Sequence, residues 1–312
     1  MNKSIRVKGG LYGLLIGDAV GVPYEFSSPE ELPPRALLEM VPPEDFRRAH
    51  QGVKPGTWSE DGAMALCLLE SLLTSDALNL QDLVQRFVRW ECEGHLAVDG
   101  AVFDIGLQTR EALRNVARGM SPERCGLAGM AQNGNGSLMR VLPLALWHTG
   151  TNLELVQLAH AQSIVTHRHV RSQVCCALYV LVARALLDGA SMDDAWADSE
   201  GILSTLYGTM PAFSAELGHV LAAKTVPPTG SGYVVDSLWS ARHACRAGRY
   251  EDVVKSAVEL GNDTDTTACI AGGLAGIHFG FEAIPLKWTD ALRGRDLVRP
   301  LEQQLLRQIT GK

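Results

Sequence analysis

A hydroxyl and two adjacent carboxylates, Ser59, Glu60 and Asp61, are the first residues in the chain whose types and spacing suggest chemistry. They stand directly before an apolar stretch whose spacing predicts a helix over 62–74. Serine is a good helix N-cap, and acids in the first turn stabilise a helix by about 0.3–1 kcal/mol, so capping alone explains the three residues. The alternative is metal binding, because hydroxyl and carboxylate oxygens are ligands for hard divalent cations.

A second segment of the same kind, Asp263, Asp265 and Thr266, precedes an apolar stretch over 266–279 much later in the chain. An extended or turn backbone directs both aspartates the same way. If the two helix starts meet, four carboxylates and two hydroxyls converge, and their repulsion requires cations between them. Oxygen ligands favour Mg²⁺, Mn²⁺ or Ca²⁺ over Zn²⁺. On that condition, the predicted metal ligands are Ser59, Glu60, Asp61, Asp263, Asp265 and Thr266.

Helices must position these residues, because apolar side chains recur every three or four positions and strand-like alternation is nearly absent. The stretch 23–56 carries seven prolines, which forbid a continuous helix, but its apolar residues make it unlike a flexible linker. We therefore predict an all-α fold, one domain over residues 1–312, with loops building the site. The predicted helices cover 9–20, 62–74, 80–92, 104–118, 138–148, 153–162, 169–188, 233–247, 251–260 and 266–279.

Composition excludes several classes of protein. With 46% hydrophobic and 20% charged residues among 312, the chain is typical of a globular protein and not of a disordered one. The longest apolar run, 174–183, is short for a membrane span, so we predict no membrane association. A net charge of −7 argues against general nucleic-acid binding. The seven cysteines include no C-x-x-C pair and suit the cytoplasm, where we predict the protein acts as a monomer.

The N-terminus imitates a signal peptide, because Lys3, Arg6 and Lys8 precede the apolar stretch 11–16. Asp18 interrupts that stretch and no clean small-x-small cleavage site follows. We therefore interpret the segment as a helix of the mature protein.

Six motifs together resemble the ADP-ribosylglycohydrolase family, and they follow the family's order over nearly the whole chain, from Gly10 to about Gly294. Each motif alone is weak. They are Gly10-Leu11-Tyr12-Gly13 with Gly17-Asp18-Ala19-Val20-Gly21, Trp58-Ser59-Glu60-Asp61-Gly62, Asn133-Gly134-Asn135-Gly136-Ser137-Leu138-Met139-Arg140, Thr166-His167, Gly232-Tyr233-Val234-Val235 and Gly261-Asn262-Asp263-Thr264-Asp265-Thr266.

The resemblance implies a compact, single-domain orthogonal helical bundle with two Mg²⁺ or Mn²⁺ ions. It also implies hydrolysis of the N- or O-glycosidic bond between ADP-ribose and an acceptor. Ser59, Glu60 and Asp61 match the family's Thr-Asp-Asp, and Asp263, Asp265 and Thr266 match its Asp-x-Asp-Thr. Glu60 departs from the pattern, because its extra methylene displaces a carboxylate by about 1 Å, enough to disturb catalytic geometry.

The resemblance also assigns catalytic roles to Glu25, Asp61 and Asp104. Glu25 matches an acidic loop residue near the scissile ribose, although an ordinary solvated acid explains it too. Asp104 matches an aspartate near the target side chain, a natural partner for an arginine guanidinium. A helix N-cap is an equally good interpretation of Asp104.

The predicted substrate contacts begin at the glycine-rich segment 133–137, because its glycines let the backbone approach a ligand and a helix start offers N–H groups to a diphosphate. A plain glycine turn is the alternative. We expect Arg140 to pair with phosphate or to lie at the surface. His167 is alternatively a satisfied loop histidine, and Tyr233 a core aromatic. The full predicted set is Asn133, Gly134, Asn135, Gly136, Ser137, Met139, His167, Gly232 and Tyr233.

The hypothesis is a metal-dependent hydrolase that removes ADP-ribose from a protein or small molecule, most simply from ADP-ribosylarginine because of Asp104. Serine, a nucleic-acid base or a small metabolite is an alternative acceptor. A second hypothesis, favoured by Glu60, is a weak or inactive ADP-ribose-binding regulator or immunity protein. A third is a metal-dependent phosphohydrolase acting on a nucleotide.

Overall fold

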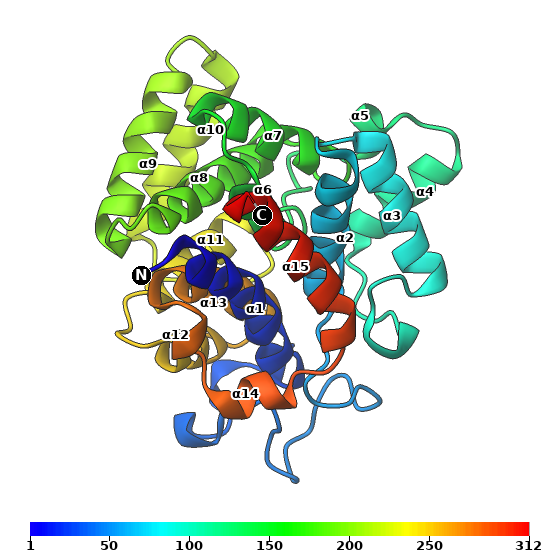
Figure 1. Cartoon of the computed structure of the whole chain (residues 1–312), viewed down its shortest axis with the longest axis vertical. Helices are drawn as coiled ribbons and strands as arrows, with labels where there is room; N and C mark the ends of the chain where they lie inside the picture. The colour runs from blue at the N-terminus through cyan, green and yellow to red at the C-terminus, as the bar shows by residue number, and fades with distance from the viewer. Residues whose placement is uncertain (312) are drawn as a thin grey trace.

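The computed structural model describes residues 1–311, and Lys312, the last residue of the predicted domain, lies outside them. Along the described residues the backbone forms α-helices, loops and short 3-10 turns, without a strand (Figure 1). The all-α prediction is confirmed, and all ten predicted helices are present. The helices are α1 (Lys3–Gly21), α2 (Glu60–Ser75), α3 (Leu80–Glu93), α4 (Leu107–Ala117), α5 (Pro122–Cys125), α6 (Leu142–Trp147), α7 (Asn152–Ile164), α8 (Val170–Leu187), α9 (Met192–Leu206), α10 (Pro211–Ala222), α11 (Val234–Ala244), α12 (Tyr250–Val258), α13 (Thr264–Phe279), α14 (Leu286–Ala291) and α15 (Arg295–Thr310).

The structure corrects several predicted boundaries and adds helices that the spacing did not predict. The helix predicted over 9–20 begins at Lys3, because the Asn2 side chain accepts a hydrogen bond from the Ser4 N–H at 2.9 Å and caps it. The helix predicted over 104–118 begins only at Leu107. Helices α5, α9, α10, α14 and α15 were not predicted. Helix α15 contains Pro300, which disfavours a helix, and the buried face of α9 includes the polar Ser199. Each residue weakens the sequence pattern that would predict its helix.

Helices α1 and α13 lie side by side in the middle of the molecule with their backbones in direct contact (Figure 1). Glycine recurs at every fourth position of α1, at 9, 13, 17 and 21, and these glycines face α13. A Cβ atom at Gly17 would lie 2.1 Å from the carbonyl oxygen of Ala268, and one at Gly9 would lie 2.0 Å from that of Gly276. Because only glycine allows this approach, the stripe brings the end of α1 against the start of α13.

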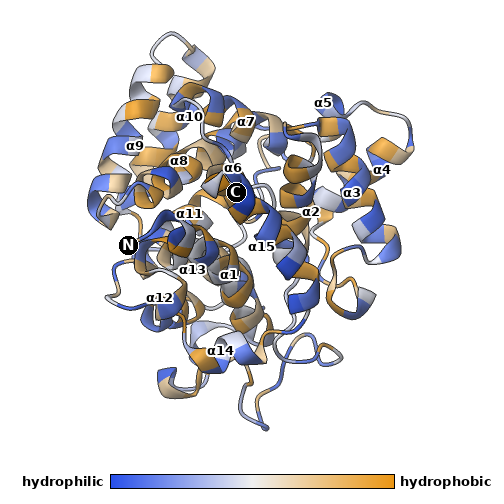
Figure 2. Ribbon diagram, viewed as in Figure 1, coloured by the Kyte–Doolittle hydropathy of each residue, from blue (hydrophilic) through white to orange (hydrophobic). Residues whose placement is uncertain are grey.

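Helix α8 runs through the interior, and apolar residues dominate it (Figure 2). By length and composition alone, α8 could cross a membrane, but 83% of it is buried inside the fold. That burial accounts for its apolar character, since a central core helix passes the same test. Six of the seven cysteines are buried and all are free, as expected for small core residues.

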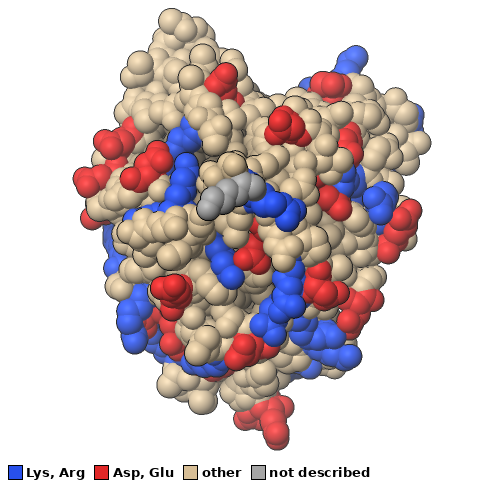
Figure 3. All heavy atoms as spheres, viewed as in Figure 1, with Lys and Arg blue, Asp and Glu red and all other residues tan. Residues whose placement is uncertain are grey.

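The proline-rich segment between α1 and α2 forms a long loop at the bottom of Figure 1, with three one-turn 3-10 helices. The Tyr24 side chain organises it: the hydroxyl donates a hydrogen bond to the Glu39 carbonyl oxygen at 2.8 Å and accepts one from the Glu39 N–H at 2.9 Å. Its ring lies 5.2 Å from the Phe46 ring. On the face in Figure 3, basic and acidic side chains are interspersed instead of gathered by sign.

Candidate active site

The ends of α1, α2 and α13 meet around the carboxylate of Asp18, which is fully buried. This carboxylate accepts hydrogen bonds from the backbone N–H of Ser59 at 2.9 Å and of Gly62 at 2.8 Å. Asp18 therefore fixes the start of α2 against α1, and the glycine stripe fixes α1 against α13. The two acidic helix starts do meet, which was the condition for the predicted cluster.

The carboxylates in this cluster have too few hydrogen bonds for buried charged groups. Glu60 Oε2, both carboxylate oxygens of Asp61 and Asp265 Oδ2 are buried without a hydrogen-bond partner among the described residues. Burial, reinforced by neighbouring carboxylates, raises the pKa of Glu60, Asp61 and Asp265 well above the ordinary range. Four unpartnered buried oxygens on three acids are costly unless a cation neutralises them.

Glu25 joins the cluster from the long loop, so the interpretation of it as a solvated acid is wrong: only 3% of it is exposed. Backbone hydrogen bonds anchor it, because Phe26 N–H donates to the Asn262 carbonyl at 2.7 Å and Asn262 N–H to the Ser27 carbonyl at 2.7 Å. Oxygens of Glu25, Asp263 and Asp265 lie within 4.8 Å of one another. Burial and the neighbouring acids raise the pKa of Glu25 to about 11.

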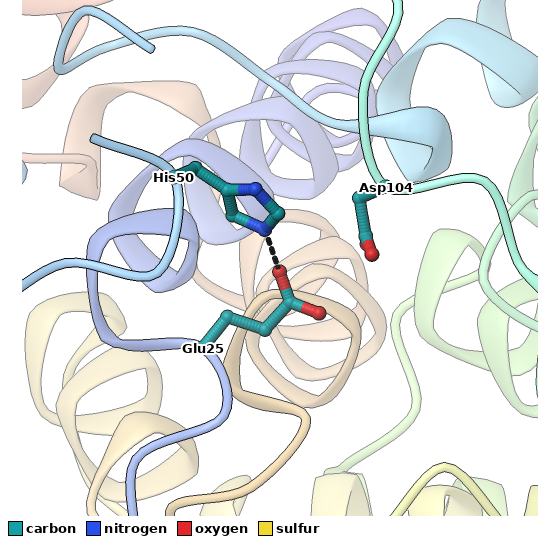
Figure 4. Close-up of side chains that lie close together, drawn as sticks. All are labelled: Glu25, His50 and Asp104. Carbon is teal, nitrogen blue, oxygen red and sulfur yellow. Dashed lines mark hydrogen bonds and ion pairs between the residues drawn. The ribbon is translucent and has the colours of Figure 1, made fainter. Parts of the chain in front are cut away.

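Glu25, His50 and Asp104 form a second group whose ligand atoms also lie within 4.8 Å of one another (Figure 4). His50 Nε2 and Glu25 Oε2 share a hydrogen bond of 2.6 Å. Asp104 reaches the group from the loop before α4, with a left-handed φ of 54°. The N-cap of α4 is Gly106, so the capping interpretation of Asp104 is wrong. Burial, followed by the charge of Asp263, raises the pKa of Asp104 to about 6.

The predicted metal ligands suit hard divalent cations, because they offer carboxylate and hydroxyl oxygens. Several of the carboxylate oxygens are buried without a hydrogen-bond partner among the described residues. Ser59 also caps α2, since its Oγ accepts from the Asp61 N–H at 3.3 Å, so the capping interpretation is confirmed without excluding ligation. Asp263 makes no capping bond and instead accepts from the Asn135 amide at 2.9 Å. Thr266 is buried beside Asp265, whose carboxylate accepts its backbone N–H at 2.9 Å.

A cavity of about 510 Å³ opens next to the acidic cluster, and Glu60 is part of its wall. Seven of the nine predicted substrate contacts line it. Its lining consists of Glu60, Gly106, Leu107, Gln108, Thr109, Met130, Ala131, Asn133, Gly134, Asn135, Gly136, His167, Gly232 and Tyr233. A concave site of this size, with polar groups and a row of glycines, suits a small polar ligand such as a nucleotide.

Two short backbone pairings hold the walls of this cavity. Gly134 pairs with Tyr233 through hydrogen bonds from Asn135 N–H to the Gly232 carbonyl and from Val234 N–H to the Asn133 carbonyl, at 3.1 and 2.9 Å. Leu127 pairs with His167 as a parallel bridge, in which Leu127 N–H donates to the Thr166 carbonyl at 3.0 Å and Arg168 N–H to the Leu127 carbonyl at 2.7 Å. His167 is a buried wall residue, and burial lowers its pKa to about 3, so its imidazole is neutral. Tyr233 is partly exposed at the cavity and is not a core aromatic.

The second half of the glycine-rich motif, residues 137–140, lies away from the cavity. Ser137 and Met139 are buried in the interior, where the Ser137 hydroxyl accepts a hydrogen bond from Ser163 at 2.8 Å. Arg140 is neither at the surface nor in the cavity, so both expectations for it are wrong. It is fully buried and donates to the Gly136 carbonyl at 3.0 Å and to the Gln162 side chain at 3.1 Å. Arg140 therefore supports the glycine loop from behind.

Asp18, His50 and Gln108 are site residues that the sequence analysis missed. Asp18 carried a signal, because an acid inside an apolar helix needs buried partners. Gln108 holds the glycine loop, since its side-chain oxygen accepts from the Gly134 N–H at 3.2 Å. His50 lies in the proline-rich loop without any pattern around it.

Comparisons with known proteins agree with this arrangement. The model of the family described as ADP-ribosylglycohydrolase matches residues 2–312. The chain is 31% identical over 304 residues to an ADP-ribosylarginine hydrolase Tri1 of Pseudomonas putida, covering 96% of this chain and 77% of that protein. It is 29% identical over 301 residues to the Tri1 protein of Serratia proteamaculans, with 96% and 78% covered. A solved structure titled as an ADP-ribosylglycohydrolase-related protein complex superimposes with a TM-score of 0.78 at 29% identity, over 98% of each chain.

Proposed function

Because this chain belongs to the ADP-ribosylglycohydrolase family and is an ADP-ribosyl glycohydrolase, we propose that it removes ADP-ribose from arginine side chains of proteins with the help of two Mg²⁺ or Mn²⁺ ions. The observation that carries the proposal is the group of four buried carboxylate oxygens without partners, next to a cavity of nucleotide size. The similar Tri1 proteins are named ADP-ribosylarginine hydrolases, which supports arginine as the acceptor.

The two ions would be held by Ser59, Glu60, Asp61, Asp263, Asp265 and Thr266. Glu25 is a neighbour of this set, because its carboxylate oxygen lies within 4.8 Å of oxygens of Asp263 and Asp265. When bound, the ions would supply positive charge that orients the ribose hydroxyls and polarises the bond to C1''. Asn135 connects this centre to the cavity, because its amide donates to Asp263 Oδ2 and to Ser237 Oγ, both at 2.9 Å.

The reaction breaks the bond between C1'' and the guanidinium nitrogen and forms a bond between C1'' and a water oxygen. One proton of that water must leave, and the departing nitrogen must receive one. Glu25 is placed to handle this proton, because its carboxyl is buried at the cluster and its Oε2 is hydrogen-bonded to His50 Nε2. As the bond breaks, C1'' becomes positive, and the surrounding carboxylates of this chain stabilise that charge.

Asp104 is the residue we assign to the acceptor. Its carboxyl lies beside Glu25 at the edge of the cluster, with a pKa of about 6 raised by burial and by Asp263. A carboxylate in that position pairs well with a guanidinium, which is planar and always charged. An acceptor without positive charge would not compensate the negative charge of the Asp104 carboxylate.

A second candidate, weak or absent turnover with retained ADP-ribose binding, is favoured by one contact of Glu60. Its Oε1 accepts a hydrogen bond from the Gly106 N–H at 3.1 Å, which leaves Oε2 as its oxygen without a hydrogen-bond partner among the described residues. The longer side chain at this position thus engages the loop before α4.

The test is release of free ADP-ribose from an ADP-ribosylated arginine protein, with Mg²⁺ or Mn²⁺ and again with chelator. We expect metal-dependent release that Asp61→Ala or Asp265→Ala abolishes and that Asp188→Ala, an exposed control just after α8, leaves unchanged. Calorimetric binding of ADP-ribose without release would favour the second candidate. Phosphate release from ADP-ribose would identify a phosphohydrolase and contradict the proposal.

A further inference from the structure

A second cavity, of about 620 Å³, lies entirely within the proline-rich loop between α1 and α2. Aromatic, proline and leucine side chains make up much of its wall, together with charged residues. Its lining consists of Glu25, Phe26, Ser27, Glu31, Pro33, Pro34, Leu37, Pro43, Asp45, Phe46, Arg47, Arg48 and Ala49.

This loop cavity is held in shape before any ligand arrives. The Tyr24 hydroxyl joins the Leu37–Glu39 turn, and its ring packs on Phe46. Arg48 Nη1 donates to the Val53 carbonyl at 2.9 Å, which closes the turn that carries His50. A preformed cavity of this volume falls in the range of ligand sites, about 300–1,000 Å³.

The loop cavity and the glycine-lined cavity share no lining residue, but each includes one carboxylate of the acidic cluster. Glu25 belongs to the loop cavity and Glu60 to the glycine-lined cavity. Asp263 links the two sides, because its carboxylate oxygen lies within 4.8 Å of that of Glu25 and accepts a hydrogen bond at 2.9 Å from Asn135, which lines the glycine-lined cavity. The cluster therefore separates two cavities.

This separation matches the two parts of the proposed substrate, on which the inference rests. If the nucleotide occupies the glycine-lined cavity and C1'' lies at the cluster, the acceptor must leave on another side. Glu25 and Asp104 are the acids assigned to the leaving group and the guanidinium, and Glu25 is the one that borders the loop cavity. The arginine would thus point from the loop cavity toward the cluster.

We propose that the loop cavity is an acceptor-side subsite that binds the polypeptide flanking the modified arginine. Its walls suit apolar side chains of that polypeptide, because Phe26 is 66% exposed and Leu37 51% exposed at its edge. Free ADP-ribosylarginine has no flanking residues, so it reaches the cluster without using this subsite. The enzyme therefore prefers ADP-ribosylarginine within a polypeptide to the free compound.

The experiment measures kcat/KM of the full chain with Mg²⁺ for two substrates, an ADP-ribosylated arginine peptide with apolar flanking residues and free ADP-ribosylarginine. The variant is Leu37→Asp, because the Leu37 side chain is half exposed and the hydrogen bonds of this residue are made by its backbone. Leu37→Met is the conservative partner. Leu153→Asp on α7, 49% exposed and outside the loop, is the matched control.

We expect Leu37→Asp to lower kcat/KM for the peptide about tenfold, through KM, and to leave free ADP-ribosylarginine within about twofold of wild type. Leu37→Met and Leu153→Asp should behave like wild type on both substrates. An unchanged kcat/KM for the peptide or an equal loss on both substrates would overturn the subsite alone. A wild-type enzyme that hydrolyses only the free compound would overturn the subsite and, with it, protein-bound arginine as the acceptor. A wild-type enzyme that releases ADP-ribose from neither substrate would overturn the proposed function, and the subsite with it.

Discussion

The carboxylate of Asp18 accepts the backbone N–H of Ser59 at 2.9 Å, although the two residues belong to different helix ends. It also accepts the Gly62 N–H, so one buried acid supplies the missing acceptors at the start of α2. This contact aims the following carboxylates, Glu60 and Asp61, into the cluster.

Replacing Asp18 with asparagine should loosen the start of α2. Whichever way the amide lies, its NH2 group replaces one carboxylate oxygen and faces the backbone N–H of Ser59 or of Gly62, donor against donor, at a cost of about 2 kcal/mol in the free energy of unfolding. We expect kcat with Mg²⁺ to fall by about tenfold or more, because Asp61 is no longer positioned. Thermal unfolding and ADP-ribose release check this. Asp188→Asn is the exposed control, and unchanged kcat in Asp18→Asn would refute the positioning role.

Replacing Asp61 with asparagine should stabilise the protein in chelator and remove its response to metal. Burial raises the pKa of Asp61, so the metal-free fold keeps this acid protonated at pH values where the unfolded chain ionises it. The resulting loss of stability begins near the ordinary pKa and grows as pH rises toward the folded pKa. Wild type should gain stability on adding Mn²⁺ or Mg²⁺, because a ligand that binds only the folded state stabilises it. The measurement is the melting temperature with and without metal. An equal metal response in Asp61→Asn and in the exposed control Asp198→Asn would argue against ligation by Asp61.

Two Gly→Ala substitutions inside helices should have opposite effects on stability, because Gly17 belongs to the glycine stripe that contacts α13 and Gly201 does not. In Gly17→Ala the new Cβ would lie 2.1 Å from the Ala268 carbonyl oxygen, so α1 and α13 must separate, and we expect a loss of about 3 kcal/mol in the free energy of unfolding. In Gly201→Ala nothing lies within 4 Å, and better helix propensity should add about 0.5–1 kcal/mol. Urea unfolding of both variants measures the contrast. A stable Gly17→Ala protein would contradict the close backbone contact.

His160 predicts acid sensitivity away from the acidic cluster. Burial lowers its pKa from 6.5 to about 4, and Nε2 is hydrogen-bonded to the Tyr207 hydroxyl at 2.7 Å. The unfolded chain binds the proton first, so this contribution to stability is complete above pH 6.5 and is lost as pH falls toward 4. The difference in the free energy of unfolding between His160→Gln and wild type should therefore shift by about 2 kcal/mol in favour of the variant from pH 7 to pH 4.5. Chemical unfolding at both pH values measures the free energy of unfolding of the variant and of wild type. A difference between the two proteins that does not change with pH would contradict a neutral, buried histidine.

The acidic segments could be recognised from the sequence because their chemistry is local. Asp263, Asp265 and Thr266 stand together before an apolar helix, and residue type alone suggests oxygen ligation. Their meeting with Ser59 could not be predicted in the same way, since it depends on hydrogen bonds that the Asp18 carboxylate accepts and on a helix contact between distant parts of the chain. The family resemblance supplied that proximity.

Positions inside a motif were harder to assign than the motif itself. Gly134 and Gly136 line the cavity, whereas Ser137, Met139 and Arg140 turn into the interior where the chain bends toward α6. Which side chains face a cavity depends on the local backbone turn, and spacing does not specify it. His50 reaches Glu25 only through the folding of the proline-rich loop, for which no periodicity exists.

The contact between α1 and α13 also orders events during synthesis. Helix α1 is complete at Gly21, but its partner begins only at Thr264, so a ribosome must add most of the chain before the two can meet. Contacts of such long sequence separation form late and slow folding, and until then the apolar face of α1 lacks its partner. The acidic cluster, which needs both helices, is therefore assembled only when nearly the whole chain has emerged, and truncated products would lack it.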